Sequence, residues 1–303
     1  MSTTIRIGTR DSELALWQAH NVQNQLQSLG YETEIVSVKS TGDLVLDKPL
    51  YELGITGIFT KTLDVAMLQN KVDIAVHSMK DVPTFLPHGI VQTAVLPRAN
   101  ARDVLVYNQT PDFSQSCTIA TGSLRRRAQW LHRYPDHEVV GLRGNVNTRL
   151  NKLSNSNWQG AIFAKAGLER IDLLPPNHQE LDWMIPAPAQ GAMVVVARED
   201  DLFCVEASAQ LNHKESEICT HVEREFLNIL EGGCTAPIGA IATVDGDSIQ
   251  FVGTLFSIDG KEKLEIEDQI DIAHFLSFGK NCALQLLDRG GRELMKQIKE
   301  QTP

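Results

Sequence analysis

Cys234 is the residue of this chain whose neighbours best suit the covalent attachment of a ligand. It follows Gly232 and Gly233 and stands three positions before Pro237. Glycine lets the backbone come close to a ligand, and proline fixes the direction in which the chain leaves the loop. The alternative is a small buried apolar residue, which is what most free cysteines are. A reactive Cys234 therefore needs support from the rest of the sequence.

An arginine-rich segment could bind an anionic small molecule. Thr121-Gly122-Ser123 stands at a predicted helix start, where hydroxyls and free backbone N–H groups attract anions. Arginine adds forked donors that match carboxylates and phosphates. We expect ligand contacts from Arg125, Arg126, Arg143 and Arg149. For Arg127 and Arg133 we favour the alternative, a solvated basic helix face.

A third candidate is the pair Lys80-Asp81, which directly follows a predicted buried strand. A carboxylate beside a lysine at a strand end could stabilise a cation or transfer protons. The alternative is a surface ion pair, worth about 0–1 kcal/mol. His77 lies within the apolar strand, so we expect it to make a structural hydrogen bond.

Composition narrows the possible partners. The chain has 303 residues, a net charge of −10 and 42% hydrophobic residues. The acidic balance disfavours nucleic acid as the main partner, whereas the local group of arginines favours an anionic small molecule. No apolar run approaches the roughly 20 residues of a membrane span. The five cysteines are odd in number and widely spaced, which favours reduced thiols in a cytoplasmic compartment over a disulfide framework or a metal cluster.

The first part of the chain alternates strands and helices. We predict strands over 4–9, 34–40, 72–78 and 90–96, and helices over 13–29 and 59–69. This alternation implies a mostly parallel sheet with helices on both faces, in which ligands bind at the carboxyl ends of the strands. Arg10, Ser12, Lys80 and Asp81 follow strands there. The polar stretch over 41–57 is typical of a functional loop.

The second part of the chain repeats this pattern, and the third part differs. Predicted strands over 104–108, 118–120, 138–142 and 160–164 alternate with helices over 124–133, 146–155 and 167–171. We expect the strand over 192–197 to return to the first sheet. After one helix over 206–230, strands over 238–244, 249–256 and 263–270 are joined by Asp-Gly pairs, which are strong hairpin signals. A helical tail follows, interrupted at Gly290-Gly291.

The predicted fold is therefore two periplasmic-binding-protein-like α/β domains joined by two crossings, plus a small C-terminal α+β domain with a three-stranded antiparallel sheet. We assign residues 1–96 and 192–209 to domain 1, residues 97–191 to domain 2 and residues 210–303 to domain 3. Two α/β domains joined by two crossings make a hinged cleft, and Cys234 belongs to the third domain.

Several separated motifs together resemble the porphobilinogen deaminase family, also called hydroxymethylbilane synthases. The motifs are Ala15-Leu16-Trp17-Gln18-Ala19-His20, His77-Ser78-Met79-Lys80-Asp81-Val82-Pro83, Ser123-Leu124-Arg125-Arg126, Leu142-Arg143-Gly144-Asn145-Val146 with Thr148-Arg149-Leu150, and Leu230-Glu231-Gly232-Gly233-Cys234 with Pro237-Ile238-Gly239. They occur in the family's order from about Ile5 to Gly239, and a fitting C-terminal domain follows. Each motif alone is weak, whereas their agreement is specific.

The resemblance implies a transferase of porphyrin and heme biosynthesis. Family members join four porphobilinogen molecules head to tail with loss of ammonia, and water then releases the linear tetrapyrrole hydroxymethylbilane. They carry a dipyrromethane cofactor, bound through a thioether to the cysteine that matches Cys234. Each pyrrole bears an acetate and a propionate, so the growing chain is polyanionic. An arginine-rich cleft agrees with such a ligand.

The resemblance also implies roles for individual residues. Asp81 would be the catalytic carboxylate, which stabilises the cation formed on deamination. The implied cofactor-binding residues are Ser78, Lys80, Thr121, Ser123, Arg125, Arg126, Arg149, Arg170 and Gln190, besides Cys234. The implied substrate-binding residues are Arg10, Ser12, Lys61, Arg143 and Arg149. No metal is expected.

The chain departs from the family pattern at a few positions. The family's loop reads Gly-Lys-Gly-(Leu/Ile)-Phe-x-Lys-Glu, and here Thr56 and Thr62 stand at its first lysine and its glutamate. Gly122 stands where a serine is common. We expect altered loop behaviour, and one cofactor hydrogen bond that is either absent or supplied by the backbone. We expect activity to be retained, because neither change touches Cys234, Asp81 or the main arginines.

Two other functions stay open at this point. A non-catalytic hinged anion-binding protein would account for the two α/β domains, although it gives no reason for a third domain with Glu-Gly-Gly-Cys. An inactive homologue with a regulatory role would be motivated only by the loop substitutions. For the enzyme we expect porphobilinogen as the small-molecule substrate, no nucleic-acid or membrane partner, and a cytoplasmic monomer.

Overall fold

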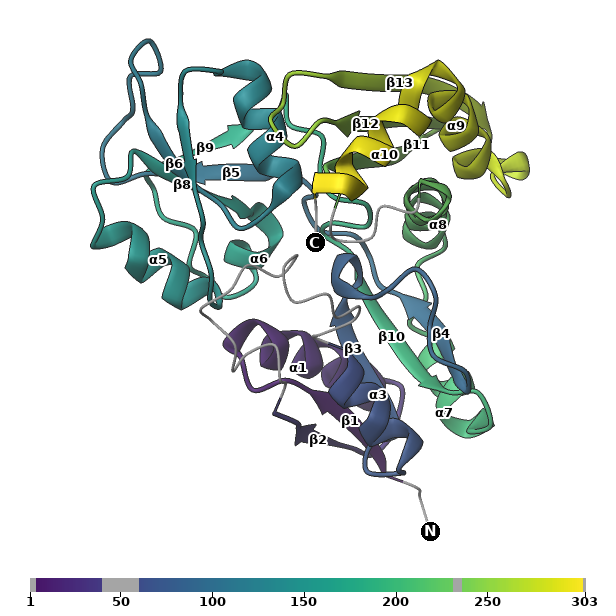
Figure 1. The fold of residues 1–303 in the computed structure, drawn as a ribbon. Helices are drawn as coiled ribbons and strands as arrows, with labels where there is room; N and C mark the ends of the chain where they lie inside the picture. Colours follow the sequence, from purple (N-terminus) through teal and green to yellow (C-terminus); the bar gives the residue numbers. More distant parts are fainter. Residues whose placement is uncertain (1–3, 40–59, 231–235, 302–303) are drawn as a thin grey trace. The chain divides into compact units, whose positions relative to one another are not determined.

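The computed structural model of the chain describes residues 4–39, 60–230 and 236–301. These residues form two five-stranded sheets and a smaller third sheet. Figure 1 shows the helices that pack on the sheets. The described chain forms two compact units, one of residues 4–39, 60–99 and 191–217, the other of residues 100–190 and 218–301 without the gap. The three-domain division stays a prediction, and the second unit holds both the second and the third sheet.

Sheet A, in the first unit, has the strand order β2-β1-β3-β10-β4. Its strands are β1 (Ile5–Thr9), β2 (Thr33–Ser37), β3 (Ile74–Ser78), β4 (Ile90–Val95) and β10 (Met193–Arg198). As predicted, the chain returns to this sheet with β10. The expected mostly parallel arrangement holds only for β2, β1 and β3, because β10 runs antiparallel to both of its neighbours. All five apolar residues of β10 are buried and only its last residue, Arg198, is partly exposed, as expected of a central strand covered on both faces.

Helices cover both faces of sheet A (Figure 1). Helices α1 (Glu13–Ser28) and α7 (Leu202–Ala209) share one apolar core with β1 and β3, in which Val22, Leu26 and Ala207 are fully buried. Helix α3 (Lys61–Leu68) packs on the other face, where a Cβ on Gly8 of β1 would lie 3.0 Å from Leu63 Cδ2. Because helices cover both faces of the sheet, polar residues are expected at its edges.

Sheet B, in the second unit, has the strand order β7-β6-β8-β5-β9. Its strands are β5 (Asp103–Val106), β6 (Thr118–Ala120), β7 (Glu138–Val140), β8 (Gly160–Ala164) and β9 (His178–Leu181), with helices α4 (Leu124–Arg133), α5 (Val146–Ser154) and α6 (Lys165–Glu169). Strands β6, β7 and β8 are parallel, whereas β5 runs antiparallel to β8 and to β9. Strand β9 was not predicted, since its sequence His-Gln-Glu-Leu lacks an apolar run.

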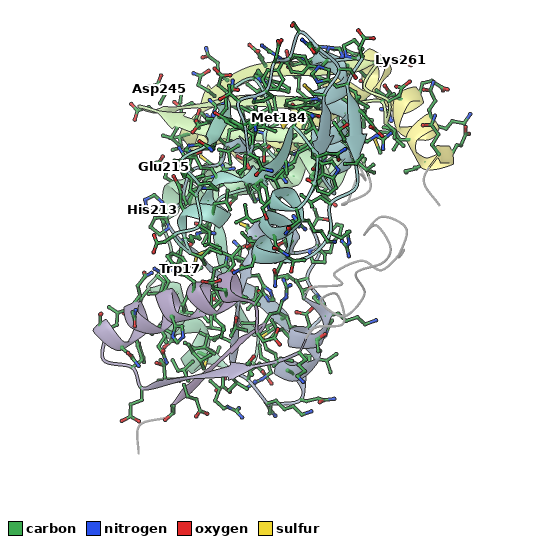
Figure 2. All side chains as sticks on the ribbon, turned by 90° about the vertical axis from the view of Figure 1, so that its left-hand side faces the viewer. Trp17, Met184, His213, Glu215, Asp245 and Lys261 are labelled. Carbon is green, nitrogen blue, oxygen red and sulfur yellow. The ribbon has the colours of Figure 1, made fainter. Side chains whose placement is uncertain are left out.

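Sheet C is the predicted three-stranded antiparallel sheet, formed by β11 (Ile238–Asp245), β12 (Ser248–Phe256) and β13 (Lys263–Asp271). Gly246 and Gly260 take the positive φ values that its two Asp-Gly turns require, +59° and +76°. Figure 2 shows the turn residues Asp245 and Lys261 at opposite ends of this sheet. Helices α9 (Phe278–Leu286) and α10 (Arg292–Gln301) pack on it around Phe226, Phe251 and Leu286.

The prediction of one helix over 206–230 was wrong. The chain forms α7 and then α8 (Lys214–Ile229), with a break between them. At the break, Asn212 Oδ1 accepts the backbone N–H of Val95 at 2.8 Å, and the N–H of His213 donates to the Val95 carbonyl at 2.7 Å. The break therefore satisfies backbone groups of β4, which helical periodicity cannot reveal.

Between the described residues 4 and 301, gaps excepted, no helix is long and apolar enough to cross a membrane.

Candidate functional site

The carboxyl ends of β1 and β3 form one polar edge, which we call edge A. The two strands are parallel neighbours, so the residues that follow them come to the same side of sheet A. Arg10 and Ser12 follow β1, and Lys80 and Asp81 follow β3. All four are partly exposed. Edge A therefore brings together the four residues that the sequence placed at strand ends in this part of the chain.

A short 3-10 turn, η2 (Met79–Asp81), holds the Lys80-Asp81 pair. The N–H of Met79 donates to the Ala192 carbonyl at 3.0 Å, and the N–H of Val82 closes the turn on Met79 O at 3.2 Å. Met79 and Val82 are buried, at 2% and 7% exposure, whereas Lys80 and Asp81 between them are not. The turn thus anchors its backbone and leaves both charged side chains at the surface of edge A.

Ser78 and His77 flank this turn on the strand side. Ser78 Oγ accepts a hydrogen bond from Gln18 Nε2 of α1 at 2.8 Å. His77 is 7% exposed, and its Nε2 is buried without a hydrogen-bond partner among the described residues, so the expected structural hydrogen bond is not made there. Burial, together with the nearby charge of Arg10, lowers the pKa of His77 to about 4. The imidazole is therefore neutral near pH 7.

Two predictions in the first unit concern the loop that precedes α3. Lys61 is exposed at the first position of this helix, and Thr62 follows it. Thr56 and the whole stretch 41–57 lie outside the described residues.

Ser12 occupies the N-cap position of α1, and its hydroxyl makes no cap hydrogen bond.

The carboxyl ends of β6, β7 and β8 form a second polar edge, which we call edge B. The three strands are parallel and adjacent, so the residues after them meet on one side of sheet B. These residues are the predicted Thr121, Ser123, Arg125, Arg126, Arg143, Arg149 and Arg170. Asp103 joins them, because β5 is antiparallel to β8 and its first residue pairs with Ala164, the last residue of β8.

The Thr121-Gly122-Ser123 turn is held by its own hydroxyls. Thr121 Oγ1 accepts the N–H of Ser123 at 3.2 Å, and Ser123 Oγ caps α4 by accepting the N–H of Arg126 at 3.4 Å. A Cβ on Gly122 would lie 2.5 Å from the carbonyl oxygen of Leu142, so a side chain at this position requires the backbone to move. The absence of a side chain at Gly122 therefore allows two loops of edge B to approach each other closely.

A buried ion-pair cluster lies at the start of α4. Asp103 is fully buried, and Arg125 and Arg126 are 4% and 5% exposed. Arg125 Nη1 donates to Asp103 Oδ2 and to the carbonyl of Ile185, both at 2.7 Å. Arg126 approaches Asp103 Oδ1 with Nε at 3.0 Å and Nη2 at 2.8 Å, and its Nη1 donates to the Ile162 carbonyl at 2.9 Å.

Charge and hydrogen bonding keep Asp103 ionised. Burial alone would raise its pKa, but the positive charges of Arg125 and Arg126 and the hydrogen bonds from Arg125 and Gln190 outweigh burial, so the pKa lies below its ordinary value.

Arg127 and Arg133 are exposed, as predicted. The two arginines between Ser123 and Arg127 are instead part of the interior, which a solvated helix face would not explain.

Gln190 lies in the segment that connects sheet B to β10. Its Nε2 donates to the carbonyl of Ala101 at 2.7 Å and to Asp103 Oδ1 at 2.9 Å. The preceding Ala189 has a φ of +61°, unusual for a residue other than glycine, and its N–H donates to Glu223 Oε2 of α8 at 2.6 Å. Glu223 Oε1 also accepts the N–H of Ala242 in β11 at 2.7 Å. Two buried carboxylates thus hold this connecting segment.

The other predicted arginines of edge B are half-buried. Arg143, Arg149 and Arg170 are each partly exposed. Burial lowers the pKa of Arg143, and it lowers that of Arg170 to about 10 against the opposing charge of Glu169. Arg143 and Arg170 therefore remain cationic near pH 7, and with the guanidinium of Arg149 they give edge B a positive balance.

Sequence reasoning missed Asp103, and it predicted a role for Cys234 that the described residues do not test. Asp103 stands directly before the predicted strand over 104–108, and only its pairing with β8 shows that it belongs to edge B. A possible signal was an acidic residue directly before the apolar run Val104-Leu105-Val106. Cys234 lies outside the described residues, so its predicted role stays a prediction.

Comparison with known proteins identifies two matching family models. Residues 5–206 match the model described as "Porphobilinogen deaminase, dipyromethane cofactor binding domain". Residues 217–288 match the model described as "Porphobilinogen deaminase, C-terminal domain". Edge A, edge B and the Gln190 segment lie within the first match, and sheet C lies within the second.

Curated relatives align over nearly the whole chain. The porphobilinogen deaminase of Trichlorobacter lovleyi is 39% identical over 300 residues, which cover 97% of this chain and 96% of that protein. The chloroplastic porphobilinogen deaminase of Oryza sativa subsp. japonica is 40% identical over 301 residues, covering 95% and 84%. Among solved structures, a periplasmic arginine-binding protein of Salmonella typhimurium superposes with a TM-score of 0.42 at 12% identity, covering 71% of this chain and 94% of that one.

Proposed function

The chain belongs to the porphobilinogen deaminase family, and from this premise we propose how its residues carry out the reaction. It is a transferase of tetrapyrrole biosynthesis with a dipyrromethane cofactor-binding domain. The reaction joins four porphobilinogen molecules head to tail, with one ammonia lost for each, and one water then releases hydroxymethylbilane.

Edge B fits a polyanionic cofactor and product chain. Arg125 Nε is buried and has no hydrogen-bond partner among the described residues, although Arg125 Nη1 is fully engaged. A ligand carboxylate would supply the missing acceptor. Arg143, Arg149 and Arg170 add positive charge on the same edge. This buried, unmatched donor is the observation that most supports the assignment.

Asp81 is the group we assign to charge stabilisation. It is carried on an anchored turn with its side chain partly exposed, so it can face a substrate without first breaking a buried ion pair. A fixed carboxylate stabilises positive charge that develops on the substrate as ammonia leaves, and such a group is worth about 3–4 kcal/mol by analogy with a preorganised oxyanion-hole donor.

The remaining assignments follow the two edges. When bound, the dipyrromethane supplies the pyrrole end to which substrate is joined. We assign its anchoring to Cys234 and its carboxylate and hydrogen-bond contacts to Ser78, Lys80, Thr121, Ser123, Arg125, Arg126, Arg149, Arg170 and Gln190. We assign substrate binding to Arg10, Ser12, Lys61, Arg143 and Arg149.

We also propose a cytoplasmic monomer with no nucleic-acid or membrane partner. Support comes from the net charge of −10 and from four free cysteines that are all buried, namely Cys117, Cys204, Cys219 and Cys282. Buried reduced thiols are ordinary in a reducing compartment.

Intact-mass measurement of the purified protein tests the proposed function. After expression in a host that makes porphobilinogen, the wild type should carry the mass of one dipyrromethane, and Cys234→Ala should carry none. Cys117→Ala, which changes a buried thiol directly before β6, is the matched control and should keep the adduct. An unmodified wild-type chain that binds porphobilinogen without releasing ammonia would instead indicate an anion-binding protein.

A further inference from the structure

Asp103 accepts hydrogen bonds from three side chains. The two neighbouring arginines contact it through different parts of their guanidinium groups. Its two oxygens receive four donor atoms, from Arg125, Arg126 and Gln190. A fully buried charge is tolerated only when its partners satisfy it, and these partners do. Arg125 and Arg126 contact Asp103 through different nitrogens, however, and this difference affects which nitrogens can bind a ligand.

The protein interior uses the Arg126 guanidinium, so a structural role replaces the cofactor contact assigned to Arg126 above. Its Nε and Nη2, which form the side-on fork of the guanidinium, both face Asp103 Oδ1, and its Nη1 faces the Ile162 carbonyl in β8. The fork most suited to a ligand carboxylate is therefore already occupied by a protein carboxylate. Arg126 ties α4 to β5 and β8.

Arg125 is held by the opposite part of its guanidinium. Only Nη1 contacts Asp103 and the Ile185 carbonyl, and the buried Nε has no partner among the described residues. Gln129, one turn further along α4, fixes the same Ile185 backbone from both sides, with hydrogen bonds of 2.8 and 2.9 Å. The orientation of the Arg125 side-on fork is thus set by the Nη1 contacts.

Gln190 extends the arrangement to the connecting segment. Its amide donates to Asp103 and Ala101, while Ala189 beside it is held by Glu223. A shift of Asp103 would therefore move α4, β5 and this segment together.

We propose that Asp103 is a positioning residue that locks Arg126 into the scaffold and presents the Nε side of Arg125 to a carboxylate of the dipyrromethane. This inference rests on the proposed function. It also gives Gln190 a task beyond the cofactor contact assigned above, which is to orient Asp103.

An ion pair can also be merely structural, and the first unit supplies a part-buried example for comparison. Arg6 and Asp73 form a two-point pair at 2.7 and 3.0 Å that joins β1 to the residue before β3. Asp73 belongs to neither edge, so Asp73→Asn is the control for the loss of an ion pair alone.

The test uses apo-protein made in a host that cannot form porphobilinogen, followed by incubation with porphobilinogen. Two readouts are recorded: the rate at which the cofactor mass appears on the chain, and the rise in melting temperature from apo to loaded protein. Asp103→Asn should load the cofactor about tenfold more slowly or worse, and its rise in melting temperature should shrink. Asp73→Asn should lower the melting temperature of the apo-protein and load at the wild-type rate.

A double-mutant cycle with Arg125→Gln separates positioning from general destabilisation. If Asp103 acts through Arg125, Asp103→Asn should slow loading by no more than about twofold in the Arg125→Gln background. The proposal is overturned if folded Asp103→Asn loads like the wild type, or if the two changes slow loading independently.

If Asp103→Asn does not fold, Gln190→Leu takes its place, because it removes one donor and leaves both arginines paired. Loading of Gln190→Leu at the wild-type rate would then overturn the proposal. A wild-type chain that never acquires the adduct would refute the proposed function itself, which is a different result from either.

Discussion

Edges A and B have the same strand arrangement, but they differ in how deeply their charged side chains are buried. In each sheet three parallel strands bring polar residues to one side, and an antiparallel strand is inserted next to them. At edge A the charged pair Lys80-Asp81 stays partly exposed on an anchored turn. At edge B Arg125 and Arg126 are buried on a carboxylate.

This difference suits two different tasks. A residue that must stabilise a charge appearing during the reaction has to be available to the substrate, and Asp81 meets that need. Residues that bind permanent carboxylates gain from being fixed in advance, because less side-chain entropy is lost on binding. This difference agrees with our proposal that edge A takes part in the chemistry and that edge B retains the anionic chain.

The largest expected effect is on edge A. Asp81→Asn keeps the shape of the side chain and removes its charge, so kcat should fall about 100- to 1000-fold while the cofactor mass is retained. Asp200→Asn, at a side chain that is 87% exposed, should change kcat by less than about twofold. Steady-state kinetics and intact mass check this, and near-normal turnover of Asp81→Asn would remove edge A from the chemistry.

Two buried carboxylates should respond to pH in opposite ways. Burial raises the pKa of Asp64 in α3 to about 6, against a hydrogen bond with Thr60 that lowers it. A raised carboxyl pKa means that stability is full below about pH 4 and declines as pH rises through 6, by about 3 kcal/mol at most. Asp103 has a lowered pKa, so its contribution is present above about pH 4 and is lost only in stronger acid.

Asp64→Asn tests this contrast. The unfolding free energy of the variant minus that of the wild type should increase by up to about 3 kcal/mol between pH 4 and pH 6.5. Urea unfolding at several pH values measures it. A difference that stays constant over this range would show that the pKa of Asp64 is the same in the folded and the unfolded chain, and the contrast with Asp103 would be absent.

A smaller effect is expected at the half-buried rim of edge B. Arg149→Leu removes a charged fork, and hydrogen bonds to charged groups are worth about 1.5–3 kcal/mol, so cofactor loading or KM for porphobilinogen should worsen about 10- to 100-fold. Arg127→Leu, at an exposed arginine of α4, is the matched control and should be near wild type. Unchanged loading and KM in Arg149→Leu would restrict ligand binding to the buried part of the edge.

The smallest effect concerns the two N-cap serines. Ser123→Ala should destabilise the second unit by about 1 kcal/mol, because Ser123 Oγ caps α4, whereas Ser12→Ala should cost less because its hydroxyl makes no cap bond. Urea unfolding compares them. Equal losses would mean that the edges do not differ in how their helices are capped.

The sequence predicted much of the local structure because local signals were strong. Helix α4 has its predicted bounds, with a serine cap before it, and sheet C follows its two Asp-Gly turns. Strand β9 and the break between α7 and α8 were missed, because each depends on backbone partners far away in the chain.

The sequence by itself determined which residues could do chemistry, and through the agreement of its motifs it determined the family. Strand ends and arginine spacing were enough to select Asp81, Arg125 and Arg126. Only the tertiary structure decided that Asp103 faces these arginines, since β5 reaches edge B by pairing antiparallel with β8 across more than half of the second sheet's sequence. Burial then decided which guanidinium nitrogens the protein uses itself and which one it leaves for a ligand.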